Sequence, residues 1–413
     1  MAKFKSFRGI RPKAGLAGKV ASLPYDVMNR EEAKKMAEGN EYSFLHVARP
    51  EIDLPDSVDP YDETVYQTAR KNLDTMLERG SLIQDVEPKL YIYRQIMRGR
   101  VQTGIAGCAS IDDYLNDVVR KHELTRVEKE IDRINNFDRC DAHTEPVFLT
   151  YRKNERLNGI VNNWIKFNAP AYDFISDDGI AHIVWDIGDP STIGTIEKIF
   201  ESMDYLYIAD GHHRSASSVK VGLKRREAAG GYSGDEEFNY FLAVAFPDED
   251  LFIMDYNRLV KDLNGYTAKQ FLTEIRKNFT VEEPAVQYKP NEKHTFGMYL
   301  EGKWYKLTAR QGTFDNDNAI ERLDVSILQN NLLGPVLGIS DPRTDKRIDF
   351  VGGIRGLEEL EKRAGQDVKA AFAMFPTTIE DLISVADSGM IMPPKSTWFE
   401  PKLRSGLFVH RFF

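Results

Sequence analysis

The stretch Ile208-Ala209-Asp210-Gly211-His212-His213-Arg214 decides how this chain is interpreted. It follows the apolar run 205–209, which predicts a buried strand, and it precedes residues 215–226, which predict a helix. The N-terminus of a helix presents backbone N–H groups and partial positive charge, which suit an anion. Gly211 allows a ligand to approach the backbone closely, and Arg214 can clamp a phosphate through two hydrogen bonds. The turn therefore predicts an anion site between a strand and a helix.

A structural interpretation of the same turn stays open from the residues alone. Asp210 would then be the N-cap of the helix, and the two histidines would pair inside the core. Two of the chain's eight histidines stand side by side in this turn. That concentration favours a functional turn over a structural one.

The composition describes a large chain with an acidic balance. Of 413 residues, 42% are hydrophobic, and the formal net charge is −9 at pH 7. This balance gives no global basic surface for nucleic acid. The N-terminal residues lack the apolar segment of a secretory signal, and the longest apolar runs, such as 240–246, are too short to span a bilayer. We therefore expect a cytoplasmic protein with neither a membrane nor a nucleic-acid partner.

The chain contains only two cysteines, Cys108 and Cys140. Two cysteines cannot build a disulfide framework or a cysteine-based zinc site, so we expect both to fill the core. Histidines and acids do not recur at metal-ligand spacing. The sequence therefore predicts no structural metal centre.

Alternating strand and helix signals organise the chain. Strands over 90–97 and 101–111 are predicted to pair around a turn at Arg98-Gly99. From residue 146 onward, a strand, a helix, a strand and a helix lead into the strand before Asp210. We expect a mixed α/β (α+β) fold, with one region over residues 1–254 and a C-terminal α+β region over 255–413.

The C-terminal region carries two helix predictions. Residues 317–333 predict a helix that ends at Gly334-Pro335. Thr377, with Glu380 three residues later, predicts a capping box at the start of another helix.

Two further clusters carry candidate chemistry. His122-Glu123 stands before a predicted helix, where the carboxylate could act as a general base; the structural alternative is a surface helix entry capped by Thr125. The stretch 393–402 joins a rigid Pro-Pro to Lys395, Ser396 and Thr397, groups that suit phosphate oxygens. It lacks the glycine-rich lead of a Walker A loop, and its structural alternative is an ordered C-terminal loop.

These three clusters, in this order, resemble the motifs of the free L-serine kinases of the ParB/sulfiredoxin-like superfamily. Those enzymes carry a His-Glu pair, a strand ending in Asp-Gly-His-His-Arg and a C-terminal Pro-Lys-[Ser/Thr]-Thr loop. Here the matches are His122-Glu123, residues 210–214 and residues 394–397. Nearly the whole chain is also similar to the proteins with domain of unknown function 1015 (DUF1015), through residues 24–27, 210–214 and 392–407. Some of those proteins are labelled Spo0J/ParB-like.

The resemblance implies a ParB/sulfiredoxin-like core with large insertions and phosphoryl transfer from ATP or ADP to the hydroxyl of free L-serine. Backbone N–H groups of Gly211, His212 and His213 would hold phosphate, and Arg214 would neutralise its charge. Asp210 would share a Mg²⁺ ion with the phosphates.

The acceptor side follows from the same resemblance. Glu123 would accept the proton of the serine hydroxyl, and His122 would orient the Glu123 carboxylate. The residues themselves offer Asp26 as the alternative base, because it stands beside Tyr25 in a Pro-anchored turn. The C-terminal stretch would contact phosphate or the serine head group through Lys395, Ser396 and Thr397.

Three other functions are alternatives for the same residues. A ParB-like nucleotide-binding switch on DNA would carry Gly-Glu-Arg-Arg where this chain has residues 211–214, together with a helix-turn-helix that the sequence does not show. A sulfiredoxin-like reductase needs a cysteine at this turn, where His212 and His213 stand. A nucleotide-binding protein without turnover stays open, as do the choice between ATP and ADP and the oligomeric state.

Overall fold

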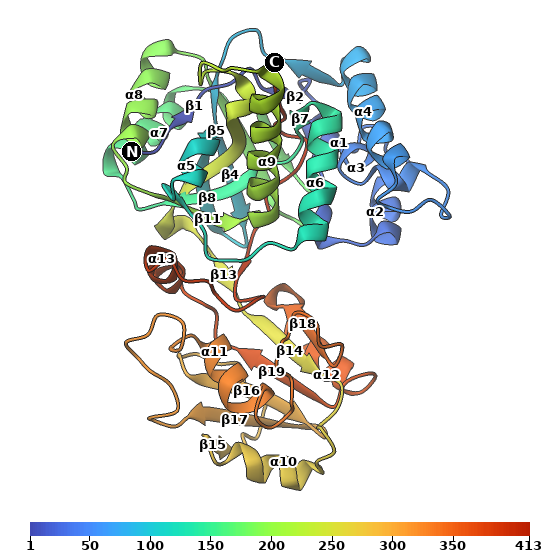
Figure 1. Cartoon of the computed structure of the whole chain (residues 1–413), viewed down its shortest axis with the longest axis vertical. Coiled ribbons are helices and arrows are strands. Elements are labelled where there is room, and N and C mark those ends of the chain that lie inside the picture. Colours follow the sequence, from blue (N-terminus) through green and yellow to red (C-terminus); the bar gives the residue numbers. More distant parts are fainter. The chain divides into compact units, whose positions relative to one another are not determined.

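The structure is a computed structural model that describes residues 1–413 (Figure 1). It contains thirteen α-helices and several β-sheets, which confirms the mixed α/β prediction. The chain forms two compact units. The first unit comprises residues 1–121, 125–251 and 401–413, and the second comprises residues 122–124 and 252–400. The predicted division into 1–254 and 255–413 differs from this, because the last thirteen residues return to the first unit.

A nine-stranded mixed sheet forms the centre of the first unit. Its order is β6-β11-β8-β12-β5-β4-β10-β9, with β1 paired to β5. Strands β8 and β12 are parallel and buried along their whole length, as expected for strands covered on both faces. The strands are β1 (Phe4–Lys5), β4 (Leu90–Met97), β5 (Arg100–Ser110), β6 (Val119–Arg120), β8 (Val147–Tyr151), β9 (Tyr172–Ile175), β10 (Ala181–Ile187), β11 (Leu206–Asp210) and β12 (Tyr240–Pro247).

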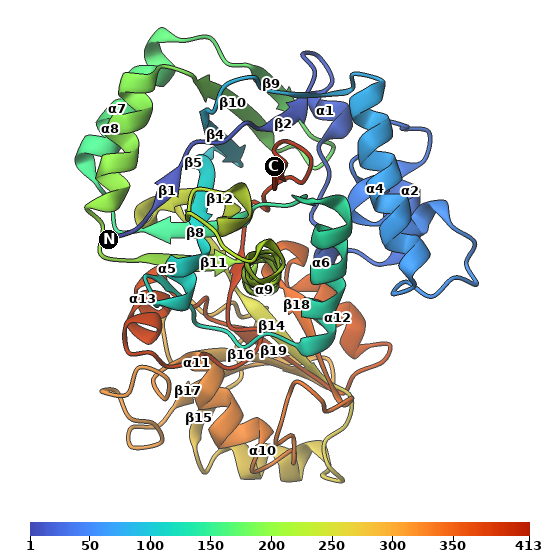
Figure 2. The ribbon, with the colours of Figure 1, turned by 45° about the horizontal axis from the view of Figure 1, so that its top comes forward.

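Helices cover this sheet, and polar side chains begin several of them. Asn154 accepts the N–H of Leu157 to cap α7, and Asp189 accepts the N–H of Thr192 to cap α8. Helix α9 packs beside α6, as Figure 2 shows. The α-helices are α1 (Ala17–Val20), α2 (Arg30–Ala37), α3 (Leu45–Ala48), α4 (Glu63–Glu78), α5 (Ile111–Leu115), α6 (Val127–Cys140), α7 (Glu155–Phe167), α8 (Pro190–Glu201) and α9 (His212–Ala229).

The C-terminal strap, residues 401–413, is built into the core of the first unit. Its strand β21 (His410–Arg411) pairs with β7 (Ala142–His143), and Val409 exchanges backbone hydrogen bonds with Ile10. Ile10 itself begins β2 (Ile10–Pro12), which pairs with β3 (Leu82–Gln84). Leu407, Phe408 and Val409 are completely buried. The strap is therefore a structural part of the first unit.

The second unit is a six-stranded antiparallel sheet in the order β15-β17-β16-β19-β14-β18. A short pair, β13 (Ile253–Met254) with β20 (Trp398–Phe399), joins the two ends of its chain segment. The sheet strands are β14 (Tyr256–Val260), β15 (Phe279–Glu282), β16 (Thr295–Leu300), β17 (Lys303–Ala309), β18 (Ile348–Gly352) and β19 (Ala370–Met374). The helices are α10 (Ala268–Ile275), α11 (Asp324–Leu328), α12 (Glu358–Ala364) and α13 (Ile379–Asp387).

Two helix predictions in this unit were wrong in their limits. The predicted helix 317–333 is α11 followed by a π-helical segment, Gln329–Leu333. Before it, the Asn318 side chain accepts two backbone N–H groups and holds a turn instead of a helix. The capping box of α13 uses Thr378 and Asp381 in place of Thr377 and Glu380. None of the chain's helices combines the length and apolarity needed to cross a membrane.

Candidate functional site

The turn between β11 and α9 has a geometry that only glycine adopts readily. Gly211 has φ +98°, in the left-handed region, and α9 begins at the next residue. A Cβ atom on Gly211 would lie 3.1 Å from Nε of Arg214, so the guanidinium packs against the glycine backbone. No side chain caps the N-terminus of α9, and its first turn contains no acid. The partial positive charge of the helix end is therefore not neutralised by its own residues.

Arg214 is buried behind this turn, with 2% of its surface exposed. Its Nη1 donates to the carbonyl of Pro146, whereas its Nε is buried and has no hydrogen-bond partner. Burial opposes its charge, but Asp26, Asp210 and Glu145 outweigh burial and raise the pKa of the guanidinium. The residue is thus a permanent buried cation whose Nε–H is enclosed by the protein and makes no hydrogen bond.

Asp210 is held as a carboxylate by two cations. Lys402 Nζ lies 3.1 Å from Oδ2, and Arg214 Nη2 lies 3.8 Å from Oδ1. Burial disfavours the carboxylate, but the charges of Lys402 and Arg214 prevail and lower the pKa of Asp210. Its side chain is 29% exposed, and it does not cap α9, as the structural interpretation of the turn would require. Asp210 therefore remains an acceptor that a ligand can reach.

Lys402 was assigned no role by the sequence, although it lies at the end of the 393–402 stretch. It belongs to the C-terminal strap, and its own carbonyl accepts a hydrogen bond of 2.9 Å from Gln95 Nε2. Only the folded strap brings it to Asp210, since 192 residues separate the two. The local sequence therefore gives no sign that Lys402 lies near the Asp-Gly-His-His-Arg motif.

Asp26 is exposed on a 3₁₀ turn, Tyr25–Val27, of the first unit. It is the acid with the strongest effect on Arg214. Arg49 fixes the turn by donating to the carbonyl of Tyr25 at 2.9 Å, and Arg133 stacks on the Tyr25 ring at 3.9 Å from the centroid. The structure therefore brings the alternative acid of the sequence analysis to the same cluster as Arg214.

Glu145 is a fully buried carboxylate that the sequence did not single out. It accepts hydrogen bonds from the N–H of Tyr25 at 3.1 Å and from Ser405 Oγ at 2.8 Å. Arg133 Nη1 lies 3.3 Å from its other oxygen. Glu145 thus joins the Asp26 turn, α6 and the strap into one charged network.

The two histidines of the motif have different surroundings. His213 Nε2 accepts the backbone N–H of Arg126 at 3.0 Å, so this nitrogen carries no proton. His212 is 5% exposed and lies in the first turn of α9. Both residues lie in the first turn of α9, where the sequence predicts that their backbone N–H groups bind phosphate.

The remaining predicted site residues lie in the second unit. The His122 carbonyl accepts the N–H of Met392 at 2.8 Å, and Glu123 follows it in the segment 122–124. Ser396 donates its hydroxyl to the Pro393 carbonyl at 2.6 Å. The roles expected for His122, Glu123, Lys395, Ser396 and Thr397 stay predictions.

The chain contains no cluster of three or more His, Cys, Asp or Glu side chains placed to hold a metal ion. Mg²⁺ in nucleotide enzymes needs one or two carboxylates, because phosphates and water supply its other ligands. Asp210 is one such carboxylate, so the donor set fits a nucleotide-borne Mg²⁺.

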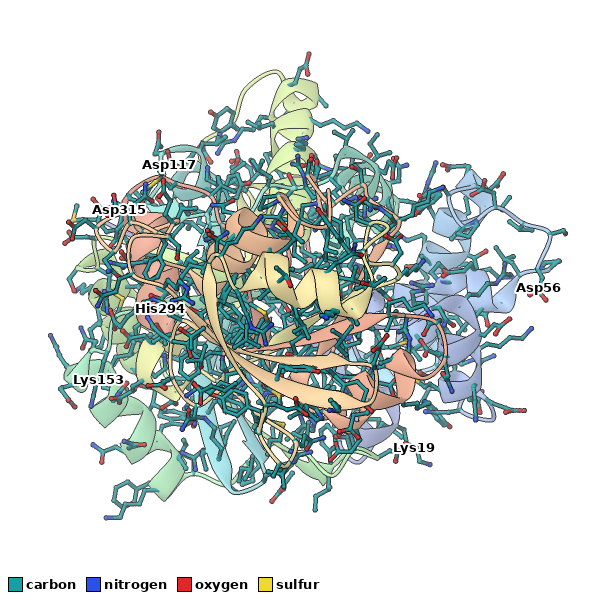
Figure 3. The ribbon with its side chains drawn as sticks, turned by 90° about the horizontal axis from the view of Figure 1, so that it is seen from below. Lys19, Asp56, Asp117, Lys153, His294 and Asp315 are labelled. Atoms are coloured by element: carbon teal, nitrogen blue, oxygen red, sulfur yellow. The ribbon has the colours of Figure 1, made fainter.

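An open cavity of about 830 Å³ lies elsewhere, on α2 and the 3₁₀ segment Pro50–Asp53. Its lining mixes Lys34 and Lys35 with Asp53 and Asp56, and Asp56 is labelled in Figure 3. No residue of the α9 turn lines it. The cavity and the charge cluster around Arg214 are therefore different places on the first unit.

A family model of proteins of unknown function, DUF1015, matches residues 4–326. The chain belongs to the DUF1015 family. This confirms the family resemblance, and the matched range contains residues 24–27 and 210–214 but ends before the third block, 392–407. No curated protein matches the DUF1015 chain.

Several solved structures are distantly similar to this DUF1015 protein. A free serine kinase in complex with AMP is 14% identical, with a TM-score of 0.36, over 72% of this chain and 90% of that chain. A conserved hypothetical protein from Pyrococcus furiosus is 14% identical, with a TM-score of 0.35, over 76% and 96%. SbnI with a C-terminal truncation, from Staphylococcus aureus, is 10% identical, with a TM-score of 0.40, over 74% and 87%. Likeness at this level assigns no function, which must be argued from the chain's own residues.

Proposed function

We propose that this protein is a nucleotide-dependent kinase that phosphorylates the hydroxyl of free L-serine to O-phospho-L-serine. The observation that carries the proposal is the buried Arg214 cation behind an uncapped helix N-terminus. The serine acceptor rests on the sequence motifs that resemble free L-serine kinases. The same motifs support a ParB/sulfiredoxin-like core in the first unit.

The donor nucleotide, ATP or ADP, would place its phosphates at the start of α9. The N–H groups of Gly211, His212 and His213 would donate to phosphate oxygens, and the Arg214 guanidinium would neutralise their charge. Such fixed donors suit phosphoryl transfer, which depends on positioning and charge neutralisation more than on covalent catalysis.

Asp210 would hold a Mg²⁺ ion delivered with the nucleotide. The ion would neutralise charge on the phosphates. Lys402 would keep the Asp210 carboxylate ionised and oriented through its 3.1 Å contact. Asp210 is therefore proposed as both a metal ligand and a catalytic residue.

The transfer itself needs a general base that accepts the hydroxyl proton. The serine oxygen attacks the terminal phosphorus, the bond from that phosphorus to the leaving nucleotide oxygen breaks, and the hydroxyl proton passes to a carboxylate. Glu123, oriented by His122, is the base implied by the motifs. Asp26 is the alternative base, and its charge is one cause of the raised pKa of Arg214. Lys395, Ser396 and Thr397 would bind phosphate or the serine head group.

A substrate screen tests this function directly. The complete chain is incubated with MgCl₂ and either ATP or ADP, together with single free amino acids, and phosphate esters are measured by ³¹P NMR. We expect O-phospho-L-serine with one of the two nucleotides and no ester with L-alanine. Nucleotide binding without any ester would favour a non-catalytic binding protein and would contradict the proposal.

A further inference from the structure

Two histidines pack against each other where the C-terminal strap meets β7, inside the first unit. His143 and His410 are opposite residues of the β7–β21 pair, and each has 1% of its surface exposed. Their rings stack with centroids 5.5 Å apart, and their Nδ1 atoms lie 3.3 Å apart. One imidazole therefore donates a hydrogen bond from Nδ1 and the other accepts it.

The partners of the two rings decide which histidine donates. His410 Nε2 lies 2.7 Å from Oε2 of Glu237, and because a carboxylate only accepts, this nitrogen carries a proton. A neutral His410 then accepts at Nδ1, so His143 donates from its own Nδ1. This leaves His143 Nε2 without a proton, and it is buried with no hydrogen-bond partner. The paired rings are therefore both neutral.

A further proton has only one place in this arrangement. The contact between the Nδ1 atoms holds one hydrogen and His410 Nε2 already carries another, so the third must lie on His143 Nε2. The rings of Phe137 and Phe412 pack on His143, with centroids 5.3 and 4.6 Å away. Burying a charged group whose donor has no acceptor is unfavourable. The closed pair therefore excludes the third proton.

The charges around the pair act differently on the two rings. Glu237 and Lys5 face His410, and Arg225 of α9 faces His143. Burial opposes the charge of Glu237, but His410 and Lys5 prevail and lower its pKa. Burial also lowers the pKa of both imidazoles; His410 and Arg225 add to this at His143, whereas Glu237 opposes it at His410.

Phe412 covers the buried imidazole and is held by two neighbours. Its N–H donates to the Asp141 carbonyl at 3.2 Å, and the Arg225 guanidinium lies 4.9 Å from its ring centroid. Arg225 is itself paired with the Asp141 carboxylate. The preceding residues, 407–409, are completely buried and stay anchored by their apolar side chains. Movement of the segment 410–412 alone therefore brings both imidazoles to water.

We infer that the His143–His410 pair is an acid-sensitive latch, which holds the segment 410–412 closed near neutral pH and releases it when a further proton binds. In the released segment both imidazoles titrate near their ordinary pKa of about 6.5. The released state then binds more protons than the closed state, so closure is favoured above this pH and is lost as the pH falls below it. The latch does not depend on the proposed kinase activity.

The test compares amide hydrogen exchange at two strap positions, by NMR of the full chain with ¹⁵N-labelled phenylalanine and valine. The Phe412 N–H donates to Asp141 and reports the latch, whereas the Val409 N–H donates to Ile10 and reports the anchored part. The ratio of the two rates cancels the effect of pH on exchange itself. We expect the Phe412-to-Val409 ratio to rise about tenfold or more between about pH 7.5 and about pH 5.5.

One variant isolates the role of His143. In H143N the side-chain amide can donate to His410 Nδ1 or accept from it, so His410 takes a proton while the segment stays closed. We expect the exchange ratio of H143N not to rise with acid. H46N is the matched control, because His46 is hydrogen-bonded to Asp53 away from the latch, and it should keep the native response.

The imidazole nitrogens test the closed state without a variant. In the chain with ¹⁵N-labelled histidine, His143 is assigned by its contact with Phe137 and His410 by its contact with Phe7. At about pH 7.5 we expect a proton on Nδ1 of His143 and on Nε2 of His410.

Three results would overturn the inference. The first is an exchange ratio that does not change between the two pH values. The second is a native rise of the ratio in folded H143N. The third, decisive also if H143N does not fold, is a proton on Nε2 of His143 at about pH 7.5.

Discussion

Gly211 is the residue on which the geometry of the α9 turn depends most. An alanine there would meet both a left-handed backbone and the Arg214 guanidinium, whereas Gly230 at the other end of α9 has φ +65° and open space around it. We expect G211A and G230A each to lower the free energy of unfolding by about 1–2 kcal/mol, measured by urea denaturation. Calorimetry with ADP should show weaker binding for G211A alone. Equal ADP affinity in the two variants would show that Arg214 does not depend on this contact.

Arg214 is the residue whose charge the proposed phosphate site requires. R214A should reduce the free energy of ADP binding by about 1.5–3 kcal/mol, the range for a lost hydrogen bond to a charged group. R214K keeps the charge but cannot reproduce the planar guanidinium, so we expect it to fall between R214A and the native chain. Circular dichroism controls for folding, and native ADP affinity in folded R214A would remove Arg214 from the site.

At the scale of elements, local sequence patterns predicted helices and turns whose determining residues are neighbours in the chain. Helix α7 is the first helix of the strand and helix order predicted from residue 146 onward, and its apolar residues and its Asn154 cap are neighbours in sequence. The hairpin of β4 and β5 turns at Arg98 and Gly99, both of which have positive φ. The capping box of α13 was misplaced by one residue. Thr377 and Thr378 both carry a hydroxyl, and only the tertiary structure shows that Thr377 donates to the Ser396 carbonyl while Thr378 caps the helix.

His182 on β10 fixes the C-terminal strap and should make the first unit sensitive to acid. Burial and the nearby charge of Arg404 lower its pKa to about 3, and its Nε2 accepts hydrogen bonds from Ser176 at 2.9 Å and from Arg404 at 3.3 Å. Its pKa in the unfolded chain is near 6.5, so below that pH the unfolded state binds the additional proton. Stability from this group is therefore present above pH 6.5 and is lost as the pH falls toward 3.

The corresponding measurement is the free energy of unfolding between pH 7 and 5, a range that lies above most carboxylate titrations. H182Q should reduce the loss of stability with falling pH by up to about 1.4 kcal/mol per pH unit. H46Q is a control of opposite sign, because the hydrogen bond to Asp53 raises the pKa of His46. An unchanged slope in H182Q would mean that the strap is not anchored through this histidine.

At the scale of the whole molecule, the sequence found the motif but not the network behind it. Asp210, Gly211 and Arg214 were predictable because they are adjacent. Lys402 was not, because it lies 192 residues beyond Asp210. Glu145 has partners 120 and 260 residues away, at Tyr25 and Ser405. Charge networks of this kind carry no local periodicity, so only the folded chain reveals them.

The choice of catalytic base decides which unit supplies the chemistry. E123Q changes the second unit, and D26N changes the first. One of them should lower kcat by about 10²–10⁴-fold and leave ADP affinity nearly intact, because the carboxylate acts only in proton transfer. The other serves as its isosteric control. Native kcat in both variants would place the base elsewhere.

A crystal structure of the full chain with ADP and MgCl₂ would show whether phosphate binds at the start of α9. We expect phosphate oxygens within hydrogen-bond distance of the N–H groups of His212 and His213, beside the Arg214 guanidinium. A well-ordered ADP whose phosphates lie away from the Gly211 turn would contradict phosphate binding at this helix N-terminus.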